Sequence, residues 1–369
     1  MFFIIFLAIW GLMHWYVLTR LSWVPGIAGH LPTWALVLAG VLLGSSYIVS
    51  RILERFHLDG LSSILEYVGA SWVGVLFVLV ISFLAADVLT GFGFWLVRWI
   101  PSIRVMALAV ALVLIVISVI QAVRAPVLTD YEVRMPSLPA AADGTVLVVA
   151  SDMHLGPMLN RNWAAARAAQ MQSLKPDLIL LVGDIFEAPR NSHEQWLPVL
   201  RQFHAPHGVF LVTGNHEFYA GPKPIVELFG RAGFRVLHDE NVEAFPGLVI
   251  AGVDDPAFRD RGSGQAERAV NRALANRPPG ATVFLSHTPV FSARASHSGA
   301  NLMLSGHTHN GQIWPFRYLV RIAFPLLTGR YDVNGMTAIV GRGTGTWGPR
   351  MRLWQRGEML RIVLRSDQT

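Results

Sequence analysis

Five short groups of polar residues carry side chains that commonly bind divalent metal ions. The groups are Asp152-x-His154, Gly183-Asp184, Gly214-Asn215-His216-Glu217, Ser286-His287 and Gly306-His307-Thr308-His309. Carboxylate, imidazole and amide groups together suit Mn, Fe, Zn or Co better than they suit Ca or Mg alone. The set is too large for one ion. It fits two adjacent ions that share a carboxylate, an arrangement that clamps both reacting oxygens in phosphoryl transfer.

Each group follows an apolar run that is typical of a buried strand. The predicted strands cover 146–150, 178–182, 209–212, 249–253, 283–285 and 302–304, and helical stretches cover 163–174, 225–232 and 266–275. Strands that alternate with helices predict an α/β fold. Polar residues at strand ends fall where such folds build their sites. Because residues i and i+2 of a strand share a face, Asp152 and His154 can turn toward one point.

Each motif taken alone has a simpler explanation, since a lone Gly-Asp pair is usually a turn or a helix cap. The five motifs together, in order and each after a strand, argue against that explanation. The glycines before Asp184, Asn215 and His307 allow sharp turns of the backbone close to the ions. The chain has no cysteine, which excludes thiolate ligands, disulfides and a cysteine nucleophile.

The series of motifs resembles the complete motif set of the calcineurin-like metallophosphoesterases, over roughly residues 145–364. The resemblance implies a four-layer α-β-β-α sandwich of two central sheets flanked by helices. The implied ligands are Asp152, His154 and His309 for one ion, Asn215, His287 and His307 for the other, and Asp184 as the bridge. His216 would stay off the metals and stabilise the transition state or protonate the leaving oxygen, with Glu217 as a nearby acid. A hydroxide held between the two ions would attack phosphorus.

The flanking sequences resemble the membrane-anchored bacterial members of that family, at 214–221, 310–313 and 343–348. Those members are similar to phosphodiesterases and lipid-processing pyrophosphatases, including hydrolases of UDP-diacylglucosamine. Asn310 stands where that subgroup commonly has glycine. The candidate substrate contacts are Asn310, Arg342 and Arg350, the arginines because guanidinium groups bind phosphate through paired hydrogen bonds.

Residues 1–125 carry only six arginines and four acids and predict a transmembrane region. Its apolar runs, at 2–18, 34–50, 67–86 and 105–123, are each near the ~20 residues that cross a bilayer. The first run lacks the basic start and the cleavage site of a signal peptide, so we predict four retained helices. Three prolines in 126–144 predict a linker, which leaves 145–369 as the catalytic domain.

Four spans place both termini on one side of the membrane. The arginines on that side are Arg51, Arg55, Arg124 and Arg134, against Arg20, Arg98 and Arg104 opposite. This small excess favours a cytoplasmic catalytic domain. The resemblance to membrane-anchored bacterial members implies that the membrane is a bacterial inner (plasma) membrane. The net charge of +6 has no strong basic run, so no nucleic-acid partner is expected. The expected partner is a membrane lipid or a lipid-linked phosphate.

The sequence therefore predicts metal-dependent hydrolysis of a phosphodiester or pyrophosphate bond, on a lipid-linked substrate at the membrane. A small-nucleotide phosphodiesterase with the same core is an alternative. A membrane interaction module that has lost activity is another, although no ligand is missing.

Residues 314–331 are unusually apolar for a segment so close to a polar site, and arginines are interspersed among them. They either dock on the bilayer with their apolar side chains in the acyl boundary and line the entrance for a lipid tail, or pack into the protein core or against the four helices. Replacing Phe324, Leu326 and Leu327 with Ser is the test that separates the two. Asp254 and Asp255, after the fourth strand, are either partners of the ligand histidines or a surface turn.

Overall fold

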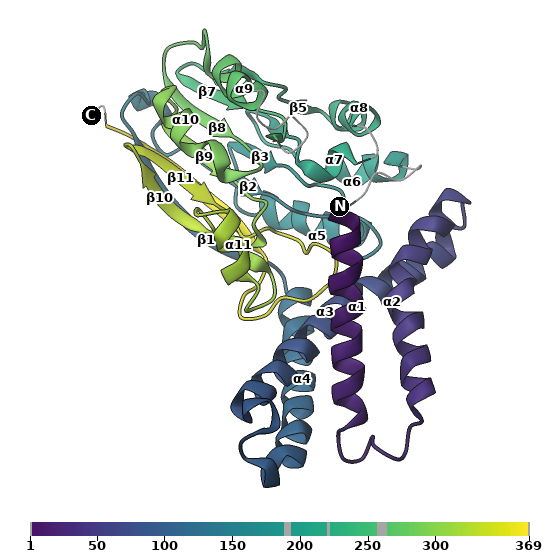
Figure 1. Ribbon diagram of the computed structural model, residues 1–369. Helices are drawn as coiled ribbons and strands as arrows, with labels where there is room; N and C mark the ends of the chain where they lie inside the picture. Colours follow the sequence, from purple (N-terminus) through teal and green to yellow (C-terminus); the bar gives the residue numbers. More distant parts are fainter. Residues whose placement is uncertain (1, 188–192, 220–221, 257–263, 368–369) are drawn as a thin grey trace. The chain divides into compact units, whose positions relative to one another are not determined.

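The computed structural model describes residues 2–187, 193–219, 222–256 and 264–367, which form two compact units (Figure 1). The helical unit contains Met1–Val123 together with Gly348–Trp354. The catalytic unit contains Arg124–Trp347 and Gln355–Thr369.

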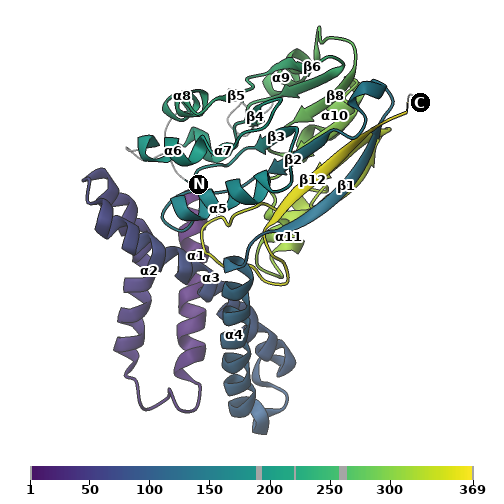
Figure 2. The ribbon, with the colours of Figure 1, turned by 180° about the vertical axis from the view of Figure 1, so that it is seen from behind.

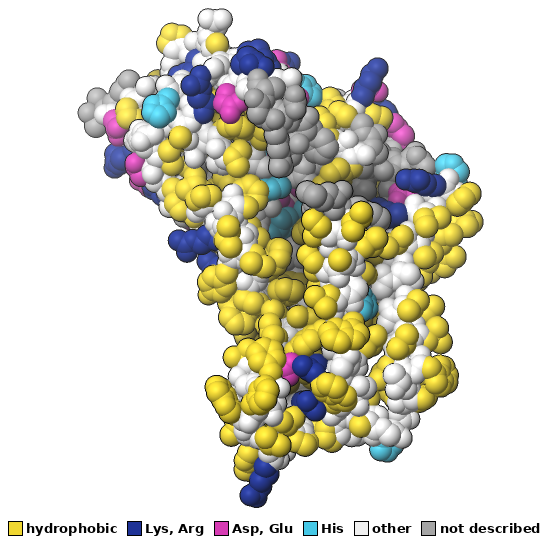
Figure 3. Space-filling view, viewed as in Figure 1, with side chains coloured by type: hydrophobic (Ala, Val, Ile, Leu, Met, Phe, Trp, Pro, Cys, Tyr) yellow, Lys and Arg dark blue, Asp and Glu magenta, His cyan; other side chains and the backbone are white. Residues whose placement is uncertain are grey.

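The helical unit has one long helix at each predicted span. These helices are α1 (Phe2–Ser22), α2 (Thr33–Arg55), α3 (Asp59–Leu89) and α4 (Ile100–Val123). Three segments, Thr33–Arg55, Asp59–Leu89 and Val97–Val123, are long and apolar enough to cross a membrane. Hydrophobic side chains cover most of the visible surface of these helices (Figure 3). A membrane crossing by α1 stays a prediction.

The helices meet through small and polar residues. A Cβ at Gly69 of α3 would collide with the backbone of Tyr47 in α2, so only glycine allows this approach. Asp87 of α3 accepts hydrogen bonds from Tyr16 Oη at 2.6 Å and Arg20 Nε at 2.7 Å. The buried carboxylate therefore joins α3 to α1 and is paired there.

The loop Gly348–Trp354 groups with the helices although we predicted it as part of a continuous catalytic domain. The backbone N–H of Arg352 donates to Ser118 O of α4 at 2.9 Å, and a Cβ at Gly74 of α3 would collide with Met351 Sδ. These partners lie more than 200 residues earlier in the chain, so no local sequence pattern indicates the pairing.

The catalytic unit contains two six-stranded sheets, whose strand orders are β1-β12-β2-β3-β4-β5 and β10-β11-β9-β8-β7-β6 (Figure 2). The strands of the first sheet are β1 (Val127–Met135), β12 (Glu358–Ser366), β2 (Val146–Ala150), β3 (Leu178–Val182), β4 (Val209–Val212) and β5 (Phe234–Val236). Those of the second are β10 (Gly329–Val333), β11 (Met336–Val340), β9 (Leu302–Ser305), β8 (Ala281–Leu285), β7 (Leu248–Gly252) and β6 (Glu240–Phe245). The strands from β2 to β5 are parallel, as are β7, β8, β9 and β11.

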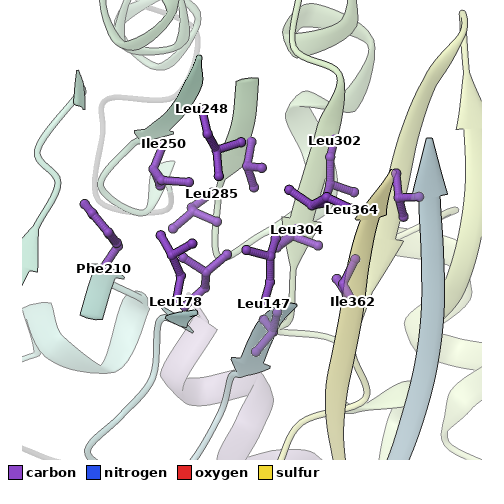
Figure 4. Packing of buried hydrophobic residues seen from close by; sticks show 14 of the residues in the cluster. Leu147, Leu178, Phe210, Leu248, Ile250, Leu285, Leu302, Leu304, Ile362 and Leu364 are labelled. Carbon is purple, nitrogen blue, oxygen red and sulfur yellow. The ribbon is translucent and has the colours of Figure 1, made fainter. Parts of the chain in front are cut away.

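Helices cover the outer faces of both sheets. The helices of this unit are α5 (Arg161–Gln172), α6 (Leu197–Leu200), α7 (Asn215–Phe218), α8 (Lys223–Arg231), α9 (Gln265–Leu274), α10 (Ser292–His297) and α11 (Arg317–Ala323). Apolar residues of α5, α6 and α8 pack on the first sheet, and those of α9 and α10 pack on the second. A third cluster, with Leu147 and Leu178 from one sheet and Ile250 and Leu304 from the other, fills the space between the sheets (Figure 4). The predicted four-layer α-β-β-α sandwich is therefore confirmed.

The prediction of a linker over 126–144 is wrong for its first half, because β1 occupies Val127–Met135. This strand pairs in parallel with β12, and Val127 lies opposite Glu358. Its side chains alternate between exposed and more buried positions, which is the period of a strand. The prolines flank the strand, and the partner strand lies at the far end of the chain, so local composition alone suggested a linker.

Candidate metal centre

The motif residues follow the ends of strands from both sheets. Asp152 and His154 follow β2, Asp184 follows β3, Asn215 begins α7 after β4, His287 follows β8, and His307 and His309 follow β9. Parallel strands bring their carboxyl ends to a common edge, which is why residues so distant in sequence converge. The structure brings Asp152, Asp184 and the five motif histidines into overlapping groups of possible ligands.

Three of these residues form one group of possible ligands. The ligand atoms of Asp152, His154 and His309 all lie within 4.8 Å of one another. His309 Nε2 is 3.0 Å from His154 Nε2 and 3.3 Å from Asp152 Oδ1. Three ligand-type atoms facing one point match the needs of one divalent cation.

A second group contains Asp184, His287 and His307. His287 Nε2 lies 3.2 Å from both Asp184 Oδ2 and His307 Nδ1. Asp184 Oδ2 also lies 3.9 Å from His154 Nε2, an atom of the first group. Asp184 therefore lies between the two groups, as a carboxylate shared by two ions must.

Asn215 contributes an amide oxygen that suits a metal ion. Its Nδ2 donates to Tyr219 Oη at 2.9 Å, and its Oδ1 is buried without a hydrogen-bond partner among the described residues. A buried acceptor without a donor is unfavourable, and a cation satisfies it. Together with two carboxylates and closely spaced ring nitrogens, this oxygen fits a dinuclear site for divalent ions.

Neighbouring groups contact the ring nitrogens of the candidate ligand histidines that face away from the site. His287 Nδ1 lies 2.8 Å from the carbonyl of Val182, which leaves Nε2 to face the ligand group. His154 Nδ1 lies 2.7 Å from Glu187 Oε2, so its Nε2 likewise faces the site. Sequence reasoning missed Glu187. The only signal was an acid three residues after Asp184.

His216 is almost fully buried beside the ligands. Its Nδ1 donates to the carbonyl of Glu187, and its Nε2 lies 4.0 Å from Asp184 Oδ2. Burial, helped by the nearby imidazole of His154, lowers the pKa of His216. Its Nε2 also falls within a third group of ligand-type atoms, with His154 and Asp184. The available nitrogen of His216 therefore faces the site.

Glu217 is completely buried and binds backbone amides. Its carboxylate accepts hydrogen bonds from the N–H groups of Gly214 at 2.8 Å, Asp184 at 3.0 Å, Ile185 at 2.8 Å and Phe186 at 3.1 Å. Burial, together with the nearby charge of Asp184, raises the pKa of Glu217 to about 7. The side chain therefore ties the loop after β3 to the loop after β4.

The two site carboxylates stay ionised among the histidines. Burial alone would raise the pKa of Asp152, but His309 and His287 hold that pKa below its usual range. The pKa of Asp184 is lowered in the same way, against the effect of burial, by His287, His216 and His154. The site is thus built to hold negative charge, which a divalent cation requires.

The backbone turns sharply at the ligands. The φ angles are positive at Asp152 (52°), His154 (47°), Asp184 (52°), His307 (69°) and His309 (47°). Such values are uncommon for residues other than glycine and cluster at functional sites. A Cβ at Gly214 would collide with Asp184 Oδ1, and one at Gly306 would collide with Asp152 Oδ2. Glycine is therefore required next to the ligands, as the sequence indicated.

Of the three predicted substrate contacts, only Asn310 lies next to the candidate ligands in the sequence of the catalytic unit. Asn310 adjoins the ligands, and its φ of 51° is one that asparagine tolerates, so it can replace glycine. Its Nδ2 donates to Gln355 Oε1 at 2.7 Å. Arg342 pairs with Glu358 Oε1 at 2.9 Å. Arg350 lies in the loop that groups with the helical unit.

Asp254 has a supporting contact near the site. Its Oδ1 accepts hydrogen bonds from Thr213 Oγ1 at 2.7 Å and lies 2.9 Å from His238 Nδ1. Thr213 immediately precedes the Gly214 motif, so Asp254 helps to hold the end of β4. Asp255 is buried, which rules out a surface turn at that residue.

Comparison with known proteins identifies relatives across the catalytic unit. Residues 145–311 match the family described as Calcineurin-like phosphoesterase. An uncharacterised metallophosphoesterase of Campylobacter jejuni is 30% identical, over 69% of this chain and 67% of its own length. A Danio rerio protein named as a transmembrane protein with a metallophosphoesterase domain is 31% identical, over 71% of this chain and 62% of its own length. An uncharacterised metallophosphoesterase of Aquifex aeolicus is 30% identical, over 64% of this chain and 90% of its own length.

The share of a relative's own length that this chain covers differs between relatives. This chain spans about three fifths of the length of the D. rerio protein and about nine tenths of the A. aeolicus protein. The matched residues 145–311 contain all five motifs. This chain therefore belongs to the calcineurin-like phosphoesterase family.

Proposed function

We propose that the chain hydrolyses a phosphodiester or pyrophosphate bond at a centre of two divalent cations. The observation that carries this proposal is the position of Asp184 between two groups of ligand atoms, with His216 Nε2 beside it. Two cations with a shared carboxylate are the arrangement that serves in-line displacement at phosphorus.

The residues of the chain divide into binding and proton-transfer roles. Two divalent cations would supply Lewis-acid polarisation of the phosphoryl group and a nucleophilic water at neutral pH. The residues that would hold them are Asp152, His154, Asp184, Asn215, His287, His307 and His309. His216 donates from Nδ1 to the Glu187 carbonyl, so the neutral ring carries no proton on Nε2. Once Nε2 has taken a proton from water, the imidazolium gives that proton to the leaving oxygen.

A substrate linked to a membrane lipid agrees with the rest of the chain. Three helices long and apolar enough to cross a membrane precede the catalytic unit. The relatives from D. rerio and Bos taurus are named as transmembrane proteins. A phosphodiester or pyrophosphate in a lipid headgroup would lie at the surface of the bilayer that these helices enter. We further propose that the catalytic unit is on the cytoplasmic side of the inner membrane.

Hydrolysis assays on the purified full-length chain loaded with Mn²⁺ test this function. The substrates are a bis-aryl phosphodiester, an aryl phosphomonoester and a lipid-linked pyrophosphate. We expect turnover of the diester and the pyrophosphate, and loss of both in Asp184→Ala. Turnover of the monoester alone, or equal activity in Asp184→Ala, would contradict the proposal.

A further inference from the structure

The catalytic unit exposes a concentrated apolar surface on and just before α11. It consists of Trp314, Phe316, Tyr318, Leu319 and Ile322, which we call the α11 surface. Tyr318 and Leu319 are each 60% exposed and Ile322 is 80% exposed. Hydrophobic side chains gather over α11 in Figure 3, with basic side chains at their edge. Five large apolar side chains exposed within nine residues indicate an interaction surface.

The charges beside the α11 surface are positive. Arg317 and Arg321 lie on the helix itself, and residues 314–331 contain no acid. Arg330 is engaged elsewhere, since it donates to the backbone carbonyl of Glu132 at 3.0 Å. Aromatic, aliphatic and arginine side chains on one short exposed helix suit the headgroup region of an anionic bilayer.

The end of this segment is attached to the metal site. The ring of Phe324 packs edge-on against His307, with 4.9 Å between ring centroids. The carbonyl of Leu327 accepts a hydrogen bond from Thr308 Oγ1 at 2.5 Å, and the Leu327 side chain is buried. Phe324 and Leu327 therefore pack into the protein. The exposed residues therefore lie earlier in the segment than Phe324, Leu326 and Leu327, the residues that the sequence suggested for replacement.

The chain itself keeps the catalytic unit close to a predicted membrane-spanning helix. Only residues 124–126 separate α4 from β1, so the catalytic unit is tethered directly to a predicted membrane-spanning helix. A bilayer is thus always present at high local concentration.

We infer that the α11 surface inserts into the headgroup region of an anionic bilayer, with Arg317 and Arg321 at lipid phosphates. Since Phe324 and Leu327 fix the segment to the His307–His309 turn, this docking places the metal site at the level of the headgroups. A phosphate in a lipid headgroup then reaches the ligands without leaving the membrane. The access of a headgroup phosphate to the metal site rests on the proposed function. The docking itself does not, and it is measured separately.

The absence of cysteine allows a direct test on the full-length chain. Ile322→Cys introduces a single thiol, which is labelled with an environment-sensitive fluorophore after reconstitution into phosphatidylcholine–phosphatidylglycerol vesicles. Lipids that carry a quencher in the upper acyl chain report contact with the bilayer. Glu227→Cys, an exposed position on α8, is the matched control.

We expect strong quenching at position 322 and little at position 227. Changing Arg317 and Arg321 to Gln should reduce the ratio of docked to undocked protein by roughly 5-fold per arginine in anionic vesicles, and much less in neutral ones. Equal quenching at both positions would overturn the inference. So would a label at 322 that is shielded from water but not quenched by lipid, since a second copy or the chain's own helices would then cover α11.

An activity measurement separates the docking from the proposed reaction. Leu319→Ser with Ile322→Ser should raise KM for a lipid-linked substrate in vesicles at least several-fold and leave turnover of a soluble diester unchanged. Equal loss on both substrates, together with a lower melting temperature, would show that the residues are part of the core and would overturn the docking. If the unmodified chain docks but hydrolyses no lipid-linked substrate, the proposed function fails while the docking stands.

Discussion

Glu187 Oε2 lies 2.7 Å from His154 Nδ1, the ring nitrogen opposite the one that faces His309. The carboxylate thus lies against the side of the ring that faces away from the site, where a partner that orients a ligand histidine belongs. Partners of this kind typically change metal affinity by about 10- to 100-fold. Their importance is therefore measurable although they do not touch the ion.

Glu187→Ala should weaken Mn²⁺ binding by about 10- to 100-fold, because His154 loses the group that orients it. Calorimetric titration of the metal-free protein measures the change. Glu194→Ala is the control, since Glu194 is an exposed glutamate that pairs with Arg231. Equal affinity in the two variants would show that Glu187 does not position the ligand.

Asp184→Ala should lose both metal ions, because its carboxylate lies between the two ligand groups. His287→Ala should mainly weaken one ion. Metal analysis of the purified variants gives the number of ions bound per chain. Two ions bound in Asp184→Ala would falsify its role as a bridge.

His216→Ala should keep its metals while turnover falls by about 10²- to 10⁴-fold, as expected for a lost general acid. The loss should be smaller for substrates with good leaving groups, because these need no proton. Rates with nitrophenolate and alkoxide leaving groups, together with metal content, test this. An equal loss on both leaving groups, or loss of metal, would argue against the assignment.

Glu217→Ala should lower the free energy of unfolding of the catalytic unit by about 3 kcal/mol or more. Four buried backbone N–H groups lose their acceptor, and each such group carries a penalty of about 1–3 kcal/mol when nothing replaces it. Thermal unfolding followed by tryptophan fluorescence measures the loss. Glu227→Ala, on the exposed face of α8, should melt like the unmodified protein.

Fusions after Thr369 should report a cytoplasmic catalytic unit. The excess of arginines on the side of the termini favours this orientation. A fluorescent-protein fusion should then be bright and an alkaline phosphatase fusion inactive. The opposite pair of results would place the unit outside the cytoplasm and would shift the expected substrates to envelope lipids.

The amino-acid sequence by itself determined the family, the candidate ligands and most of the core. The apolar runs that predict β2, β3 and β4 coincide with the strands, and those for β7, β8 and β9 differ by at most two residues at either end. This is because buried parallel strands are continuous apolar runs with polar residues at their ends. The candidate ligands could also be recognised from the sequence, because divalent metal ions bind only a few kinds of side chain.

The edge strand β1 could not be predicted without knowledge of the tertiary structure. β1 was predicted as a linker because its apolar residues alternate with polar ones and prolines flank it, and its partner β12 lies more than 200 residues away. The loop Gly348–Trp354 groups with the helices for a similar reason, through partners in α3 and α4. Pairings across such distances leave no trace in a short window of sequence.

Only the tertiary structure decided how the site is supported and which apolar residues are exposed. Glu187 and Glu217 are ordinary acids in the sequence, and their roles depend on which backbone and ring nitrogens the fold brings to them. In the segment 314–331 the same apolar composition supplies a buried Leu327 and an exposed Ile322. Composition fixes how much apolar surface a segment carries, but the packing of its neighbours determines which part of that surface stays exposed.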